Sequence, residues 1–198
     1  VRAAVPGYPG NFDEVPVQLN VVEGIWYQNF DASTHGWTLN SEWGWGAPSG
    51  NGPGGCYSGS CIGVAMTGYY SNGLTWATCN ATSPAIDLST TTAPVLQFRS
   101  WLSSEGSVWD GGNLKVSTDG VNYTVVTSVT PAYNCSAIDG QPAWGEDYET
   151  WNQTWAVFEA DLSAYAGQST VYLRFGFRTD TSVNTYPGWY IDEVMILD

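Results

Sequence analysis

The sequence predicts an all-β protein, an antiparallel β-sandwich with long loops rich in glycine and tryptophan. Three observations support this fold class. Short segments with apolar residues at every second position recur along the chain. Clusters of Gly, Asn, Ser and Pro separate them, and no segment keeps the apolar stripe of a helix. The 198 residues suit one sandwich domain, which we place at residues 25–198 behind an N-terminal extension at residues 1–24.

Alternating patterns predict strands at residues 95–102, 154–158, 170–178 and 188–197. In the clearest of them, Val171, Leu173, Phe175 and Phe177 share one face, and Tyr172, Arg174, Gly176 and Arg178 share the other. Asp119-Gly120 between two alternating runs predicts a hairpin over residues 114–125. We expect mostly loop at residues 41–71, and an edge strand at residues 14–22 because of Pro16.

The charge balance excludes two classes of partner. The chain has 5 basic and 19 acidic residues, a formal net charge of −14. Such a chain repels nucleic-acid phosphates and anionic membrane surfaces. No apolar run approaches the roughly 20 residues that span a bilayer, so we expect no membrane insertion. The acidic residues either keep the protein soluble or include a few that converge on a hard cation such as Ca²⁺.

Four cysteines, Cys56, Cys61, Cys79 and Cys135, allow three disulfide pairings. The glycine-rich segment from Cys56 to Cys61 can close on itself, which leaves Cys79 with Cys135. Zinc is the competing interpretation, but the spacing is long for a zinc knuckle and no neighbouring ligands are present. Disulfides imply an oxidising compartment, so we expect a secreted, extracellular or cell-surface protein.

Four N-x-[S/T] sequons support the same placement, and each lies near a predicted turn or strand end. They are Asn80, Asn122, Asn134 and Asn152. Their number predicts surface glycosylation where the source organism has the machinery.

The aromatic content is high, with 11 Trp and 12 Tyr residues. Four tryptophans in loops could form a binding surface for sugar rings or for a partner protein. They are Trp43, Trp45, Trp109 and Trp144. The alternative is that they pack beneath their own loops. Trp37, Trp101 and Trp155 lie in strand patterns and are expected in the core.

Catalytic machinery finds little support in the sequence. The one histidine, His35, lies in a predicted turn, and no Gly-x-Ser-x-Gly motif is present. Glycosidase carboxylates could be sought among Glu105, Asp110 and the acidic residues of 146–149, but the spacing of the latter is wrong for jelly-roll glycosidases. We therefore predict that the protein is not an enzyme.

A series of landmarks resembles the MAM-like jelly-roll modules of bacterial secreted proteins, including immune-inhibitor-A-type metallopeptidases. In order these are Asn29-Phe30-Asp31, Gly36-Trp37, Trp45-Gly46-Ala47-Pro48, residues 83–89, Leu96 with Phe98, Trp109-Asp110-Gly111-Gly112, residues 116–120, residues 161–167, Leu173-Arg174-Phe175 and residues 188–194. The resemblance covers about residues 25–198 and implies a jelly-roll sandwich. It also implies a structural Ca²⁺ held by Asp31, Asp110 and Asp192. The His-Glu-x-x-His motif of the peptidase half is absent.

Three functional hypotheses follow. The first is a non-catalytic, extracellular structural or adhesive module that self-associates or binds other surface proteins. Its strand-like residues 1–24 would add to a sheet edge of the next copy and build a filament. The alternative is a carbohydrate-binding module with glycans as partners. A glycosidase is the weakest reading.

Overall fold

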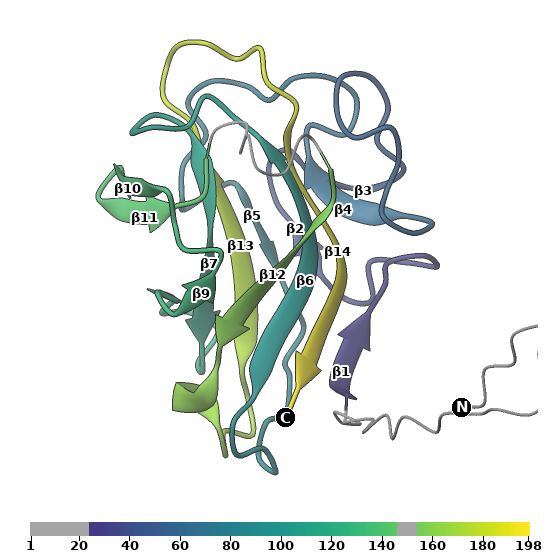
Figure 1. The fold of residues 1–198 in the computed structure, drawn as a ribbon, viewed down its shortest axis with the longest axis vertical. Coiled ribbons are helices and arrows are strands. Elements are labelled where there is room, and N and C mark those ends of the chain that lie inside the picture. The colour runs from purple at the N-terminus through teal and green to yellow at the C-terminus, as the bar shows by residue number, and fades with distance from the viewer. Residues whose placement is uncertain (1–23, 146–153) are drawn as a thin grey trace, which may run out of the picture.

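The computed structural model describes residues 24–145 and 154–198. These residues form two facing antiparallel sheets (Figure 1), which confirms the predicted all-β jelly-roll sandwich with long Gly- and Trp-rich loops. Within these ranges the helical structure is one 3₁₀ turn, η1 (Ser163–Tyr165). No helix in the described part of the chain is long and apolar enough to cross a membrane. The predicted strand at residues 14–22 and the proposed donor segment lie outside these ranges, except for Gly24.

The larger sheet has seven strands in the order β3-β4-β14-β6-β12-β9, and β1 pairs with β14 beside this path. Its strands are β1 (Gly24–Gln28), β3 (Trp43–Gly46), β4 (Cys61–Val64), β6 (Val95–Ser103), β9 (Val129–Thr130), β12 (Ala156–Asp161) and β14 (Gly188–Leu197). The three predicted strands at residues 95–102, 154–158 and 188–197 correspond to β6, β12 and β14.

The smaller sheet has five strands in the order β2-β5-β13-β7-β8. They are β2 (Thr38–Leu39), β5 (Asn80–Thr82), β7 (Gly111–Ser117), β8 (Thr124–Val125) and β13 (Tyr172–Arg178). A separate hairpin of β10 (Cys135–Ile138) and β11 (Gln141–Ala143) lies beside β7 (Figure 1). The pairing of β7 with β8 confirms the predicted hairpin around Asp119-Gly120, where Gly120 adopts φ +72°, a conformation that glycine tolerates.

The core lies between the two sheets and follows the predicted alternation. On β13 the side chains of Leu173, Phe175 and Phe177 are fully buried, while the neighbouring Tyr172 and Arg174 face outward. Phe98 on β6 and Phe175 on β13 have ring centroids 5.0 Å apart, so the two sheets meet through aromatic contacts.

Residues 41–71 were expected to be mostly loop, yet they contain β3 and β4. Glycines interrupt both strands and weaken the usual strand signal. Steric contacts require these glycines. A Cβ on Gly44 would lie 2.8 Å from Cγ of Met66, and a Cβ on Gly63 would meet the ring of Tyr190. These strands therefore need glycine at positions where a sequence pattern suggests a turn.

The predicted disulfide between Cys56 and Cys61 is present. The predicted pair of Cys79 with Cys135 is wrong, because the two thiols lie in different buried clusters and are not joined. Cys79 belongs to the core between the sheets. Cys135 lies on the β10–β11 hairpin. It packs in a second cluster that includes Trp76, on the other side of the five-stranded sheet.

The structure separates the predicted glycosylation sites. Asn80 is buried at 2% exposure and donates its amide to the carbonyl of Ala77, so the expectation of a glycan there is wrong. Asn122 and Asn134 are exposed. Asn152 lies outside the described residues. Glycosylation of the last three positions stays a prediction.

Candidate functional site

Two of the four tryptophans predicted to form a binding surface are buried in the core. Trp43 packs edge-on against Trp189. Trp144 contacts the rings of Phe98 and Phe158 and donates its Nε1 proton to the carbonyl of Pro131 at 2.8 Å. The prediction is wrong for both, because Trp43 begins β3, Trp144 pairs with Gly112 of β7, and both rings belong to the hydrophobic core.

The other two, Trp45 and Trp109, are 43% and 48% exposed. Trp45 donates its Nε1 proton to the carbonyl of Phe30 at 2.7 Å, which fixes its ring. The carbonyl of Trp109 accepts a hydrogen bond from Nη1 of Arg178 at 2.8 Å. Trp45 lies on β3 of the seven-stranded sheet, whereas Trp109 precedes β7 of the five-stranded sheet.

The three predicted Ca²⁺ ligands do not converge on one site. Asp31 accepts a hydrogen bond from the Ser60 amide at 3.3 Å, and Asp192 accepts one from the Ser58 amide at 2.9 Å. Both carboxylates therefore fasten the disulfide loop. Asp110 lies elsewhere, in a different group of carboxylates, so the predicted set is wrong as a single site.

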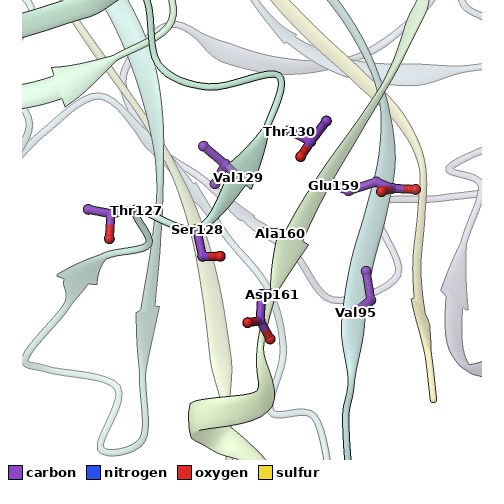
Figure 2. Close-up of a pocket in the computed structure, with 8 residues that line it drawn as sticks. All are labelled: Val95, Thr127, Ser128, Val129, Thr130, Glu159, Ala160 and Asp161. Atoms are coloured by element: carbon purple, nitrogen blue, oxygen red, sulfur yellow. The ribbon is translucent and has the colours of Figure 1, made fainter.

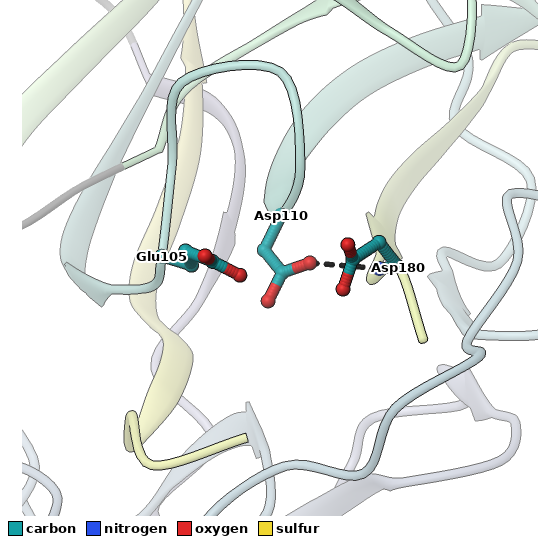
Figure 3. A group of neighbouring side chains, drawn as sticks. All are labelled: Glu105, Asp110 and Asp180. Carbon is teal, nitrogen blue, oxygen red and sulfur yellow. Dashed lines mark hydrogen bonds between the residues drawn. The ribbon is translucent and has the colours of Figure 1, made fainter. Parts of the chain in front are cut away.

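Asp110 clusters with Glu105 and Asp180, and one carboxylate oxygen from each of the three lies within 4.8 Å of the other two (Figure 3). Asp110 is fully buried, and it accepts hydrogen bonds from the Tyr70 hydroxyl at 2.7 Å and the Asp180 amide at 2.8 Å. Burial and the two neighbouring carboxylates raise the pKa of Glu105. Its Oε2 atom is buried without a hydrogen-bond partner.

This carboxylate cluster fits a hard cation better than it fits glycoside hydrolysis. Both oxygens of Asp110 are engaged and the side chain has no solvent exposure, so it cannot reach a glycosidic oxygen. Three carboxylates, one of which has an unpartnered oxygen, are oxygen donors of the kind that Ca²⁺ prefers.

A hollow of about 300 Å³ lies beside the β9–β12 edge (Figure 2). It is lined by Val95, Thr127, Ser128, Val129, Thr130, Glu159, Ala160 and Asp161. None of these residues has a ring on which a sugar could stack. Its carboxylates are already engaged, with Glu159 bonded by Gln97 at 2.9 Å and Asp161 by the Ser163 amide at 2.8 Å.

The outer face of the five-stranded sheet carries a different chemistry, and we call six of its residues the cation face. They are Trp76, Asn113, Lys115, Tyr123, Tyr172 and Arg174. Asn113 and Lys115 alternate with core residues on β7, as Tyr172 and Arg174 do on β13. The antiparallel register places Lys115 directly opposite Arg174. The pleat of the two strands therefore brings both cations to one side of the sheet.

Each of these cations lies against an aromatic ring. The guanidinium carbon of Arg174 is 3.4 Å from the ring centroid of Tyr123, and its Nε donates to Oγ1 of Thr82 at 3.0 Å. Nζ of Lys115 is 4.8 Å from the ring centroid of Trp76. These are cation–π distances.

Trp76 is held in place from two sides. Its Nε1 proton goes to the carbonyl of Ile138 on the β10–β11 hairpin, at 3.2 Å. Its ring lies over Gly176, where a Cβ would come within 3.3 Å of ring carbon Cε3. A larger residue at position 176 would displace the ring from Lys115.

The electrostatics of the cation face are unusual for so acidic a chain. Lys115 is only 6% exposed, and burial together with Arg174 lowers its pKa from 10.5 to about 8. The ion pairs formed by residues 24–145 and 154–198 involve Arg99 and Arg178, not Lys115 or Arg174. Beside Lys115 on β7, Oδ1 of Asn113 is buried without a hydrogen-bond partner.

Sequence reasoning missed the cation face. A usable signal was present, because Lys115 is the only lysine of the chain and stands in a predicted hairpin. Arg174 stands on the polar face of the clearest predicted strand. The sequence pattern does not reveal the strand register that places Lys115 beside Arg174.

Comparison with known proteins defines the fold and not a family. No protein-family model and no curated protein matches the sequence. Among solved structures, the C-terminal family 22 carbohydrate-binding module of Clostridium thermocellum Xyn10B matches with a TM-score of 0.50 and 13% identity, over 88% of this chain and 93% of that one.

Two other similar structures are more distant in geometry. One is the CBM22-1 xylan-binding domain of Paenibacillus barcinonensis Xyn10C, with a TM-score of 0.49 and 11% identity over 91% of this chain and 97% of that one. The other is the K1 cleaved adhesin domain of Lys-gingipain from Porphyromonas gingivalis W83, with a TM-score of 0.48 and 17% identity over 86% and 96%. At these identities, the match to the Xyn10B module establishes a shared sandwich fold.

Proposed function

We propose that the protein is a non-catalytic, extracellular carbohydrate-binding module that holds its glycan on the cation face. The observation that carries the proposal is the row of aromatic rings and donor groups on the outer side of β7 and β13. Tyr123 and Tyr172 offer partly exposed rings, and Arg174 and Lys115 offer donors beside them. Flat apolar rings with flanking polar groups are how a pyranose is bound.

The fold is compatible with this function without establishing it. The matching module of Xyn10B is named a carbohydrate-binding module, and the Lys-gingipain domain is named an adhesin. One sandwich thus serves more than one task, so the residues of the site support the proposal and the fold alone does not. The disulfide between Cys56 and Cys61 supports an extracellular location.

A glycan array followed by isothermal titration calorimetry tests the proposal. Tyr123→Ala removes the ring that lies over Arg174 and should weaken binding about fivefold, because a lost stacking contact costs roughly 1 kcal/mol. The matched control is Tyr57→Ala, since Tyr57 is exposed and lies under Arg99 in the same kind of contact on the other sheet.

Three results of this test are informative. The proposal is supported if the wild-type protein binds a glycan, Tyr123→Ala binds it more weakly, and Tyr57→Ala binds it as the wild type does. Silence of a broad array with folded protein would refute it. Equal weakening by both substitutions would move the site away from the cation face.

We also propose a structural Ca²⁺, held by Glu105, Asp110 and Asp180 in place of the predicted set. Glu105 belongs to this group of three carboxylates and its Oε2 is unpartnered, which supports the proposal. The ion would join the loops that precede β7 and follow β13. Its chemistry there would be charge neutralisation, with no part in a reaction.

A further inference from the structure

The cation face contains a pair of like charges that the fold leaves uncompensated. Lys115 and Arg174 are directly opposite each other on adjacent antiparallel strands. Like charges in that position destabilise a sheet. The chain has 19 acidic residues, yet in the described ranges no carboxylate forms an ion pair with either cation.

The contrast with Arg99 shows that the fold can compensate a cation on a sheet. Arg99 also lies on a sheet face and over a tyrosine ring, that of Tyr57, at 4.2 Å. Its guanidinium has a carboxylate partner, Glu193, at 3.6 Å. Lys115 and Arg174 keep the aromatic contact and have no such partner among the described residues.

Donor groups of both Lys115 and Arg174 are available to bind an anion. Nε of the Arg174 guanidinium donates to Oγ1 of Thr82, and the guanidinium also hydrogen-bonds the Tyr123 hydroxyl, so a carboxylate would bind beside that contact through the remaining Nη–H groups. Among the described residues no ion pair engages Nζ of Lys115, which lies 4.8 Å from the centroid of the Trp76 ring. An unfavourable local arrangement of this kind, two like charges on adjacent strands without a carboxylate partner, occurs mainly at functional sites.

Resting on the proposed function, we propose that the glycan is acidic and that a uronate carboxylate binds between Lys115 and Arg174. The rings of Tyr123 and Trp76 flank that position. The net charge of −14 repels densely charged polyanions. The ligand that fits is therefore a glycan in which uronate residues are separated by neutral sugars.

The test compares two glycans of that type, hyaluronan and glucuronoxylan, each with its carboxyl-reduced form, by calorimetry on the full chain. At least one should bind at least about tenfold more tightly than its reduced form, since a charge-assisted contact of this kind is worth about 10- to 100-fold. Lys115→Gln and Arg174→Gln should each abolish that preference. Arg99→Gln, which removes one charge from the other sheet, should keep it.

The outcomes separate this inference from the proposed function. Equal binding of acidic and reduced forms by the wild-type protein overturns the uronate site, and it needs no variant that must fold. A preference that survives Lys115→Gln and Arg174→Gln, or that Arg99→Gln also removes, overturns it as well. In each of these cases glycan binding that depends on Tyr123 leaves the proposed function standing. If no glycan is bound, both proposals fail.

Discussion

Replacing Lys115 with methionine should stabilise the unliganded protein. The substitution keeps an apolar stem of similar length and removes the buried charge opposite Arg174. A pKa lowered from 10.5 to about 8 means that folding disfavours the charged amine by ~3 kcal/mol. Loss of the contact with the Trp76 ring offsets ~1 kcal/mol of this. We expect a net gain of ~2 kcal/mol in the free energy of unfolding at pH 7.

The pH dependence gives the sign of the effect. Below about pH 8 the amine is protonated in both the folded and the unfolded protein, so the cost is fully present. Between about pH 8 and 10.5 the unfolded chain holds the proton and the folded protein does not, so wild-type stability rises with pH. The advantage of Lys115→Met should therefore shrink over that interval.

Urea unfolding of both proteins from pH 6 to 10.5, followed by tryptophan fluorescence, measures this difference. The comparison of the two proteins cancels the titration of the other groups. A variant that is no more stable than wild type at pH 7 would refute the reasoning. So would a difference that stays constant up to pH 10.5.

Three further predictions follow from the packing and the acid cluster. Thiol titration of the unreduced, denatured protein should find two reactive thiols, because Cys79 and Cys135 are not joined to each other; finding none would restore the disulfide predicted from the sequence. Trp144→Ala should lower the free energy of unfolding by ~3–5 kcal/mol because it empties a fully buried site, whereas Trp109→Ala should change it by no more than ~0.5 kcal/mol; equal effects would contradict the packing. Chelation should lower the melting temperature of the wild-type protein and not that of Glu105→Gln; a melting temperature that chelation leaves unchanged would remove the proposed Ca²⁺.

The fold was largely predictable because strand burial imposes a period of two. Residues 170–178 alternate so strictly that the buried face of β13 could be read from the sequence, and Asp119-Gly120 marked the hairpin. The strands β3 and β4 could not be predicted from the sequence, because their glycines are required by close contacts with Met66 and Tyr190. Those contacts come from distant parts of the chain.

The site was less predictable for the same reason. Composition marks a tryptophan in a loop as a candidate for the surface, but only packing distinguishes Trp144 in the core from Trp109 in solvent. Lys115 and Arg174 meet through the register of β7 with β13, which no local pattern states. The acid cluster likewise joins Asp110 to Asp180 across two loops.

The most direct test of a glycan site on the cation face is an NMR titration of ¹⁵N-labelled protein with the tightest-binding glycan of the array. We expect the largest amide shifts on β7 and β13, around Lys115 and Arg174, and on the turn that carries Tyr123. Shifts concentrated instead on β6, β12 and β14, around Arg99 and Tyr57, would place the ligand on the other sheet and contradict the account.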